Sequence, residues 1–376
     1  MILICIASFS IGAIEYFSNK RVVTRSLRKN NESFGLLLML LSLVILMGGS
    51  SQNPDTQIYK NLYAMRFYSK DPGFGLLVSF LKSRGVSLEI IRLGIAVIGL
   101  VLINTVVKRY LPQRYQFVFY LLYVIYPFFM DVTQVRNFLS AAILSYAFDF
   151  LLSQEKRGII IYLILIFVAA SFQKAFIIYI PFAFINKVNK EKVIKYLLGG
   201  AAVFSVFILW NKSIVVALSA VLNNLFADNI TDLSHYLAKS TRFGGYVYWL
   251  QTFLNLYILR ECLKRQKSCA VAKDSKEYRF SELVYWANVY SIIFLPLVLI
   301  TIDFFRIQRN LQILNYITYL ITFSEMRKAH ASVKSKQVLI LLVFVLVVYA
   351  FYWMFLHDGD INTIIIPILK NNWIIP

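Results

Sequence analysis

Two short stretches of the sequence place the same polar residue types where an apolar run ends. The first reads Asp131-Val-Thr-Gln134-Val-Arg136-Asn137, and the second reads Asp303-Phe-Phe-Arg306-Ile-Gln308-Arg309-Asn310. A guanidinium group carries a fork of hydrogen-bond donors that fits phosphate oxygens. The pattern therefore favours binding of an anionic group by Arg136 and Arg309. The alternative is that each Arg pairs with its nearby Asp as a structural latch, and the two interpretations are compatible.

A third polar stretch precedes both of them. It contains Asp55, Tyr59 and Tyr63, followed by Asp71 in the sequence Asp-Pro-Gly-Phe. Carboxylates are scarce in this chain, which has 19 Asp and Glu residues. Two of them among tyrosines could bind a sugar hydroxyl or remove its proton. Asn-Pro-Asp and Asp-Pro-Gly are also ordinary turn signals, and the turn is the favoured interpretation from sequence alone.

Two further polar positions lie between apolar runs. Gln173 follows Phe172 at a predicted turn, where it is either a site residue or a group that faces lipid headgroups. Arg242 lies in a segment from 228 to 245 that ends in the pair Gly244-Gly245. That segment is either a lid over a site or only a connecting loop.

Composition predicts the kind of protein that must position these residues. Apolar residues make up 59% of the chain and charged residues 15%, and the mean hydropathy is +0.65. A water-soluble core cannot hold such an excess, because soluble domains are about 45–50% apolar and about 25% charged. The apolar residues form blocks of roughly 15–20 residues, the length of a helix that crosses a bilayer. We therefore predict an all-α transmembrane bundle, forming a single integral membrane domain over residues 1–376.

Twelve apolar blocks are predicted to span the membrane. They cover about 1–17, 34–49, 88–107, 115–130, 137–152, 158–170, 175–186, 196–210, 246–259, 283–302, 311–325 and 338–356. The first block is interpreted as a retained helix with its N-terminus outside. The stretch 214–226 is a possible thirteenth span, but an interfacial helix is the favoured interpretation.

The position of positive charge orients this bundle. Twelve spans with the N-terminus outside place 25 of the 39 Lys and Arg residues in short inner loops, as the positive-inside rule requires. The net charge of +20 is therefore assigned to orientation rather than to nucleic acid. The long outer segments are then about 50–87 and 211–245. Arg136 and Arg309 lie at the outer face, against the charge rule, and Arg92 lies within a span. Charge at membrane depth is costly and is by default a functional hypothesis.

Several chemistries find no support in the sequence. The three cysteines show no metal spacing, and Cys262 and Cys269 fall in a predicted inner loop, where a disulfide is not expected. There is no Walker loop, Gly-x-Ser-x-Gly elbow or His-Glu-x-x-His sequence. No cofactor is therefore predicted, and no motif predicts a metal site. Catalysis is expected to be metal-independent, the alternative being a metal held by scattered carboxylates.

The order of these features resembles the EpsG family of bacterial exopolysaccharide proteins, which are similar in role to the Wzy polysaccharide polymerases. The resemblance covers about residues 50–185. It consists of the outer stretch with Asp55, Tyr59 and Tyr63, the Asp71-Pro-Gly-Phe74 sequence, Gln134-Val-Arg136-Asn137 opening a helix, and the Phe172-Gln173-x-Ala-Phe turn before an apolar hairpin with Pro181. The family commonly has His where this chain has Gln173. That position is therefore not expected to act as a base, because an amide does not exchange a proton usefully near neutral pH.

The resemblance implies a polymerase at the outer face of the bacterial plasma membrane. Such proteins join oligosaccharide repeat units carried on undecaprenyl diphosphate into capsular or exopolysaccharide, without a metal. It implies that Arg136 and Arg309 contact the diphosphate, that Arg306 or Arg242 supports them, and that Asp55 or Asp71 lies near the acceptor. The remaining polar residues predicted to bind substrate are Tyr59, Tyr63, Gln134, Asn137, Gln173 and Asn310. Chain-length regulator and flippase proteins are the implied protein partners.

Two other functions fit the same composition. A flippase for lipid-linked oligosaccharide also needs cationic groups for a diphosphate, but should place them in a cavity that opens to both faces. The predicted arginines lie at one face, which favours an enzyme. A non-catalytic assembly subunit would tolerate replacement of Asp55, Arg136 and Arg309.

Overall fold

The computed structural model describes residues 34–65, 70–153, 155–187, 190–210, 245–357 and 360–375. Four predictions lie outside these residues or almost wholly so. They are the first span over 1–17, the stretch 214–226 with its choice between span and interfacial helix, the outer segment 211–245 with its choice between lid and connecting loop, and the substrate-binding role of Arg242.

The described part of the chain consists of helices and the turns that connect them, and its one β-type pairing is an isolated bridge between Ser50 and Asn372. This confirms the predicted all-α class. Five helical stretches are long and apolar enough to cross a membrane, namely Leu88–Tyr110, Gln113–Thr133, Val135–Ser153, Lys276–Leu299 and Val333–Leu356. Shorter apolar helices accompany them, among them Phe34–Gly49, Lys174–Asn186 and Ile194–Ile208. These helices make the chain an integral membrane protein, while the count of twelve spans stays a prediction.

The helices group into two units, and the prediction of one membrane domain stays untested by this grouping. The first unit combines Met1–Tyr146 with Ala350–Pro376, and the second is Ala147–Tyr349. Helices of the first unit are α2 (Phe34–Gly49), α3 (Thr56–Ala64), α4 (Pro72–Lys82), α5 (Leu88–Tyr110), α6 (Gln113–Tyr123), η1 (Val124–Phe128), α7 (Phe129–Thr133), α8 (Val135–Ala147), η6 (Tyr352–Leu356), η7 (Ile361–Ile365) and α18 (Ile366–Lys370).

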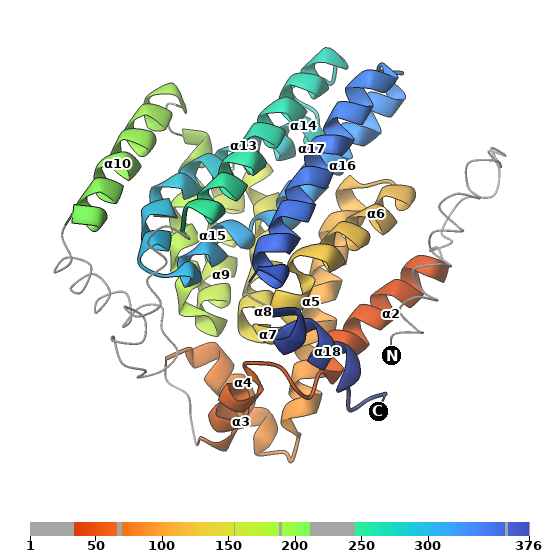
Figure 1. The fold of residues 1–376 in the computed structure, drawn as a ribbon, viewed down its shortest axis with the longest axis vertical. Coiled ribbons are helices and arrows are strands. Elements are labelled where there is room, and N and C mark those ends of the chain that lie inside the picture. Colours follow the sequence, from red (N-terminus) through yellow and green to blue (C-terminus); the bar gives the residue numbers. More distant parts are fainter. Residues whose placement is uncertain are drawn as a thin grey trace. The chain divides into compact units, whose positions relative to one another are not determined.

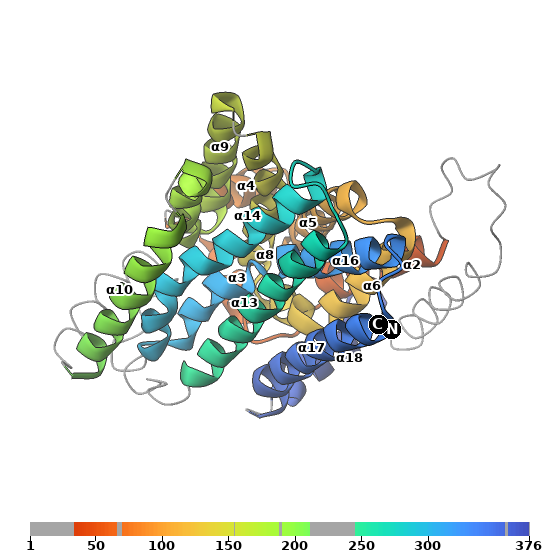
Figure 2. The ribbon, with the colours of Figure 1, turned by 90° about the horizontal axis from the view of Figure 1, so that it is seen from above.

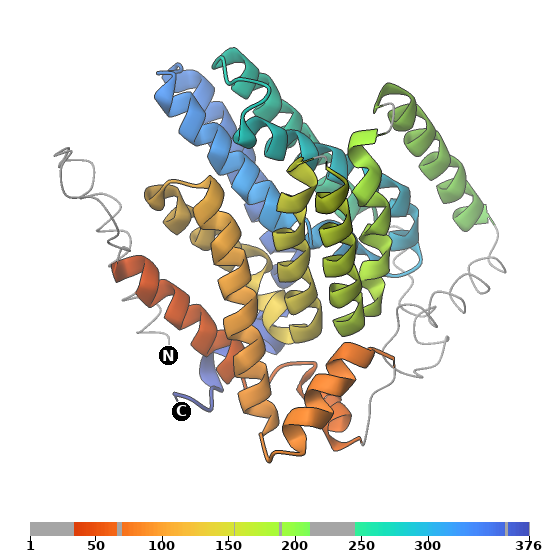
Figure 3. The same ribbon diagram turned by 180° about the vertical axis from the view of Figure 1, so that it is seen from behind.

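Helix α5 is the central support of the first unit. It packs along α2, as Figure 3 shows, and also contacts α6. A Cβ atom added at Gly99 of α5 would lie 2.2 Å from the Cε1 atom of Phe138 in α8, which is too close for any real contact. Glycine therefore lets α8 approach α5 closely. This approach fixes the first turn of α8, where Arg136 lies.

The predicted outer segment 50–87 is more ordered than the turns predicted from its sequence. It contains two short helices, α3 and α4, which pack against each other and against α5 (Figure 1). Pro72 occupies the first turn of α4, where its missing N–H is tolerated. Tyr59 and Leu62 of α3 are buried, as are Phe74 and Val78 of α4. Each pair has the three- or four-residue spacing of a single helical face.

Residues near the C-terminal end of the chain hold the start of this segment. The Trp373 backbone N–H donates to the Gly49 carbonyl oxygen (3.0 Å), and its indole N–H donates to the Gly48 carbonyl oxygen (3.1 Å). The Ser51 N–H donates to the Asn371 carbonyl oxygen at 2.9 Å. A Cβ atom at Gly49 would collide with the Asn372 side chain, so this contact requires glycine. The end of α2 is therefore fixed by residues 371–373.

The second unit begins with a tight helical pair. Its helices are η2 (Phe148–Ser153), α9 (Lys156–Phe172), η3 (Lys174–Lys187), α10 (Lys190–Trp210), α13 (Gly245–Ser268), α14 (Lys276–Ser291), η4 (Ile292–Leu299), η5 (Ile302–Phe305), α15 (Arg306–Arg309), α16 (Gln312–Lys328) and α17 (Val333–Phe351). The η3 segment, which contains Pro181, is a 3₁₀ helix packed against α9. The two helices form an apolar hairpin around the Phe172-Gln173 turn, with Pro181 in the second of them.

Helices α13, α14 and α16 lie side by side in the second unit (Figure 2). Buried amides join them. The Asn288 Nδ2 donates to the Asn315 Oδ1 at 2.7 Å, and the Asn315 Nδ2 donates to the Asn255 Oδ1 at 3.3 Å. The hydroxyl of Tyr319 also donates to the Asn255 Oδ1 (2.6 Å). Polar side chains that satisfy one another in this way hold helices together where water is excluded.

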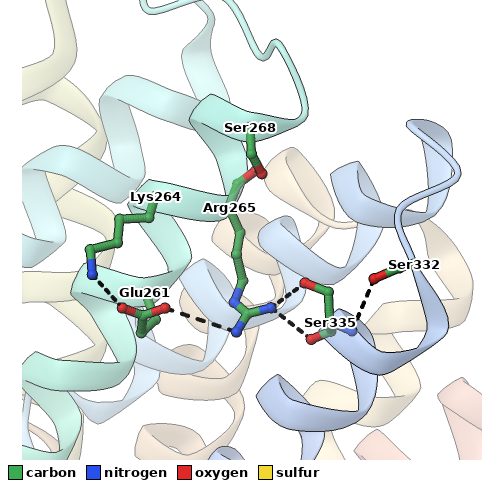
Figure 4. Close-up of polar contacts among 6 residues, drawn as sticks. All are labelled: Glu261, Lys264, Arg265, Ser268, Ser332 and Ser335. Atoms are coloured by element: carbon green, nitrogen blue, oxygen red, sulfur yellow. Dashed lines mark hydrogen bonds and ion pairs between the residues drawn. The ribbon is translucent and has the colours of Figure 1, made fainter.

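One end of α13 is tied to the start of α17 (Figure 4). The Arg265 guanidinium donates to the carbonyl oxygen of Ser335 at 2.7 Å and also to its hydroxyl, while its other arm lies 3.9 Å from Glu261. Ser332 accepts a hydrogen bond from the Ser335 N–H at 3.2 Å. These residues come from the two segments, about 260–279 and 327–336, that the charge count assigns to the inner face. In the structure, parts of both segments therefore meet where α13 ends and α17 begins.

Candidate functional site

The first site motif lies at a break between two helices. Helix α7 ends at Thr133 and α8 begins at Val135, with Gln134 between them in a non-helical conformation (φ −106°, ψ 60°). The Gln134 carbonyl oxygen still accepts the first hydrogen bond of α8, from the N–H of Phe138 at 2.9 Å. The break directs the side chains of the first turn of α8, Arg136 and Asn137 among them, and both are buried.

Arg136 forms an ion pair with Asp71. Its Nη1 lies 2.5 Å from the Asp71 Oδ2, and each side chain is 3% exposed. The sequence-based latch hypothesis assigns Asp131 to Arg136, whereas this pair joins Arg136 to a carboxylate 65 positions earlier. Removing either partner would leave an uncompensated buried charge. The pair therefore connects the start of α4 to the start of α8.

Two aromatic rings flank the same guanidinium. The Cζ atom of Arg136 lies 5.7 Å from the Tyr59 ring centroid and 5.5 Å from that of Phe74. The two rings meet edge to face, with centroids 6.2 Å apart. The Tyr59 hydroxyl also accepts a hydrogen bond from the Arg136 backbone N–H at 3.3 Å. Ring faces attract a cation at these distances, so α3 and α4 both hold Arg136 in place.

Asp131 has a buried partner of its own. The hydroxyl of Tyr123, on α6, donates to its Oδ2 at 2.8 Å. Both residues are buried, and the hydrogen bond stabilises the carboxylate in an apolar setting. Nothing in the sequence distinguishes Tyr123 from the many other aromatic residues in its block.

The other predicted residues of the outer segment lie around this cluster. Asp55 is half-buried at the N-terminus of α3, and its N–H donates to the Asn53 Oδ1 at 3.1 Å, which is the turn predicted for Asn-Pro-Asp. The Tyr63 hydroxyl donates to the Val86 carbonyl oxygen (2.9 Å). The catalytic role of Asp55 and the substrate-binding role of Tyr63 stay predictions. The structure brings together three predicted residues here, namely Tyr59, Asp71 and Arg136.

The second motif lies in the second unit and is built differently. Arg306 pairs with Asp303, three residues earlier, at 2.5 Å, and the two side chains are 30% and 42% exposed. This is the local latch that the sequence offered as an alternative, made by Arg306 rather than Arg309. Arg309 and Asn310 are instead buried, with 4% and 6% exposure. A common face for the two motifs stays a prediction.

Tyr179 of η3 holds this second motif. Its hydroxyl donates to the Ile307 carbonyl oxygen at 2.9 Å, hydrogen-bonds with the Asn310 side chain, and is close enough to Arg309 for electrostatic interaction. Gln173 is buried just before η3, at the end of α9. Tyr179 was not predicted as a site residue, although it lies two residues before Pro181 in the same hairpin.

Comparison with known proteins places these motifs in a family. The sequence model of the EpsG family matches residues 34–367, which is nearly the whole chain and includes both polar motifs and the outer segment between α2 and α5. No curated protein matches the chain, and no solved structure does. The resemblance inferred from residues 50–185 therefore extends over the second unit as well. The chain belongs to the EpsG family.

Proposed function

We propose that this protein is a polymerase that joins undecaprenyl-diphosphate-linked oligosaccharide repeat units into capsular or exopolysaccharide at the outer face of the bacterial plasma membrane. Membership of the EpsG family supports a role in polysaccharide polymerisation. The observation that carries the proposal is the buried Arg136–Asp71 ion pair between the rings of Tyr59 and Phe74.

Burial of this pair in an apolar chain needs a reason. A buried ion pair is often less stabilising than well-packed apolar residues of the same volume, because both charges lose their water. Ionisable groups within membrane proteins accordingly mark substrate or ion sites by default. A lipid diphosphate is an anion presented at the membrane surface, and a rigidly held guanidinium matches its oxygens. The pair therefore favours a site for such a substrate over a purely structural contact.

The proposed reaction is a glycosyl transfer between two lipid-linked chains. A hydroxyl oxygen of one repeat unit forms a bond to the anomeric carbon of the growing chain. The bond between that carbon and the diphosphate oxygen breaks, and the lipid diphosphate leaves with the electron pair. The proton of the attacking hydroxyl passes to a carboxylate. Arg136 and Arg309 stabilise the negative charge that develops on the leaving group, with Arg306 or Arg242 in support.

The two carboxylates of the outer segment have different roles in this proposal. Asp71 is held by Arg136, so it fixes the guanidinium and is a poor proton acceptor. Asp55 is more exposed, and we assign the acceptor hydroxyl to it. Tyr59, Tyr63, Gln134, Asn137, Gln173 and Asn310 supply polar contacts to the sugars. Chain-length regulator and flippase proteins are the proposed partners.

The direct test uses the purified protein in lipid nanodiscs with a lipid-linked repeat unit. A polymerase yields a ladder of longer glycans, and Asp55→Ala shortens or abolishes that ladder. Arg84→Ala is the matched control, since Arg84 is an exposed arginine of the same segment. A ladder that fails to form, together with movement of labelled lipid-linked sugar between leaflets of proteoliposomes, would establish a flippase instead. Full activity of Asp55→Ala, Arg136→Ala and Arg309→Ala would contradict the catalytic assignment.

A further inference from the structure

Arg92 is a buried cation that has no role in the site described above. It lies in the first turns of α5, and only 4% of its surface is exposed. Its Nε and Nη2 atoms are buried and have no hydrogen-bond partner among the described residues. Guanidinium nitrogens are strong donors, and a buried donor without an acceptor costs free energy. Among the described residues, Arg92 therefore lacks the acceptors that its buried position calls for.

The surroundings of Arg92 are those of the candidate site. Helix α3 packs against α5, and Arg92 interacts electrostatically with Tyr59, Glu89 and Asp55. Tyr59 is also the ring that flanks Arg136. The two arginines are therefore related through a single tyrosine, and both belong to the first unit.

The two guanidinium groups differ in their partners. Arg136 has a carboxylate, that of Asp71, in direct contact. Within the described ranges no carboxylate forms an ion pair with Arg92, although Asp55 and Glu89 act on it from a greater distance. Such attraction keeps the guanidinium charged but leaves its Nε and Nη2 atoms without an acceptor among the described residues. An anionic oxygen in hydrogen-bonding contact would both balance the positive charge and accept hydrogen bonds from the guanidinium.

We propose that Arg92 binds an anionic oxygen of the diphosphate of the lipid-linked substrate, beside Asp55 and Tyr59. This inference rests on the proposed function, and it assigns to Arg92 the direct anion contact near the start of α5. Arg136, already paired with Asp71, then contributes a fixed positive charge nearby. The acceptor hydroxyl assigned to Asp55 would thereby lie near the anomeric carbon whose diphosphate Arg92 binds, so that the hydroxyl oxygen bonds to that carbon as the diphosphate leaves.

Binding can be measured without turnover. The full chain in zwitterionic nanodiscs is titrated with undecaprenyl diphosphate, with undecaprenol, with inorganic diphosphate and with phosphatidylglycerol. We expect Arg92→Met to weaken binding of undecaprenyl diphosphate by about 10-fold to 100-fold, the equivalent of a lost charge-assisted hydrogen bond. Arg92→Lys should retain part of the affinity, because it keeps the charge but not the fork of donors. Arg84→Met, at an exposed arginine, should bind as the wild type does.

Thermal stability without ligand separates this role from a structural one. If Arg92 awaits an anion, Arg92→Met should leave the unliganded melting temperature unchanged or raised, and should abolish its increase on adding undecaprenyl diphosphate. A lowered melting temperature with unchanged ligand affinity would show that Arg92 only balances Asp55 and Glu89, and would overturn the inference. Equal binding of phosphatidylglycerol or inorganic diphosphate would overturn the assignment to the lipid-linked diphosphate.

The two proposals fail in different ways. Unchanged binding by Arg92→Met, while the wild type still forms a glycan ladder, overturns the role of Arg92 and leaves the polymerase proposal standing. A wild-type protein that neither binds undecaprenyl diphosphate nor forms a ladder overturns both.

Discussion

The Nη1 atom of Arg136 lies 2.5 Å from the Oδ2 atom of Asp71, although 65 positions separate the two residues in the sequence. This contact joins the start of α4 to the first turn of α8. Because of this contact, neither residue is a loop residue exposed to water. Asp71 is the N-cap residue of α4 and Arg136 lies at the break before α8, so the pair depends on two helix ends.

Loss of either charge of this pair should affect both stability and polymer formation. Arg136→Ala and Asp71→Asn should each destabilise the protein by about 3–5 kcal/mol, because a buried charge loses its partner. Polymer should be absent in both variants. The free energy of unfolding in micelles and the glycan ladder measure the two effects. The exchange Asp71→Arg with Arg136→Asp should recover part of the stability, and a double variant no better than either single one would contradict the pairing.

Replacement of the two arginines of the second motif should affect polymer formation to different extents. Arg309 is buried, whereas the pair of Arg306 with Asp303 is partly exposed and therefore contributes about 1 kcal/mol or less. Arg309→Ala should abolish polymer while single repeat units persist. Arg306→Ala should leave measurable polymer. Cell-surface glycan length, compared at equal protein levels, tests this prediction. A greater loss of polymer in Arg306→Ala than in Arg309→Ala would refute the assignment.

The hydroxyl and the ring of Tyr59 should contribute separately. Tyr59→Phe removes a long acceptor contact of 3.3 Å, so we expect a loss near the lower end of about 0.5–1.5 kcal/mol. Tyr59→Ala also removes the ring beside Arg136 and Phe74, and a loss of about 3–5 kcal/mol is expected for a buried aromatic residue. Denaturation of both variants measures the difference. Equal losses would show that the ring makes no separate contribution.

Cysteine labelling tests the orientation. Cys269 is partly exposed in the segment assigned to the inner face, while Cys262 is buried and burial raises the pKa of its thiol to about 12. In a Cys5→Ser background, an impermeant maleimide should label Cys269 only after the membrane is permeabilised. Arg84→Cys should be labelled in intact cells. Labelling of Cys269 without permeabilisation would invert the topology.

Hydropathy predicted the long helices well, because a helix that crosses the bilayer needs a continuous apolar run of a certain length. Such a run can be recognised in the local sequence. The predicted block 88–107 corresponds to Leu88–Tyr110, and the block 338–356 lies within Val333–Leu356. The helices α3 and α4 were not predicted. They are short, and Asn-Pro-Asp and Asp-Pro-Gly signal a turn equally well whether or not a helix follows.

The site was predictable in its residue types and not in its pairings. Asp71 and Arg136 were both selected, because charge is scarce in an apolar chain and arginine at the outer face opposes the charge rule. That they bind each other depends on how α4 and α8 approach α5, which no local pattern encodes. Tyr123 and Tyr179 were missed for the same reason, since a tyrosine hydroxyl acquires its role only from a distant partner.

The hydrogen bonds that fix the end of α2 set an order of events during synthesis. The Ser51 hydroxyl donates to the Asn371 carbonyl oxygen at 3.0 Å, across 320 positions of the chain. The segment that carries Asp55 and Tyr59 starts just after this anchor, yet the anchor cannot form until the ribosome has added residue 371. Through most of translation, the outer segment therefore lacks its final attachment. A chain interrupted before residue 371 inserts its helices without completing this support.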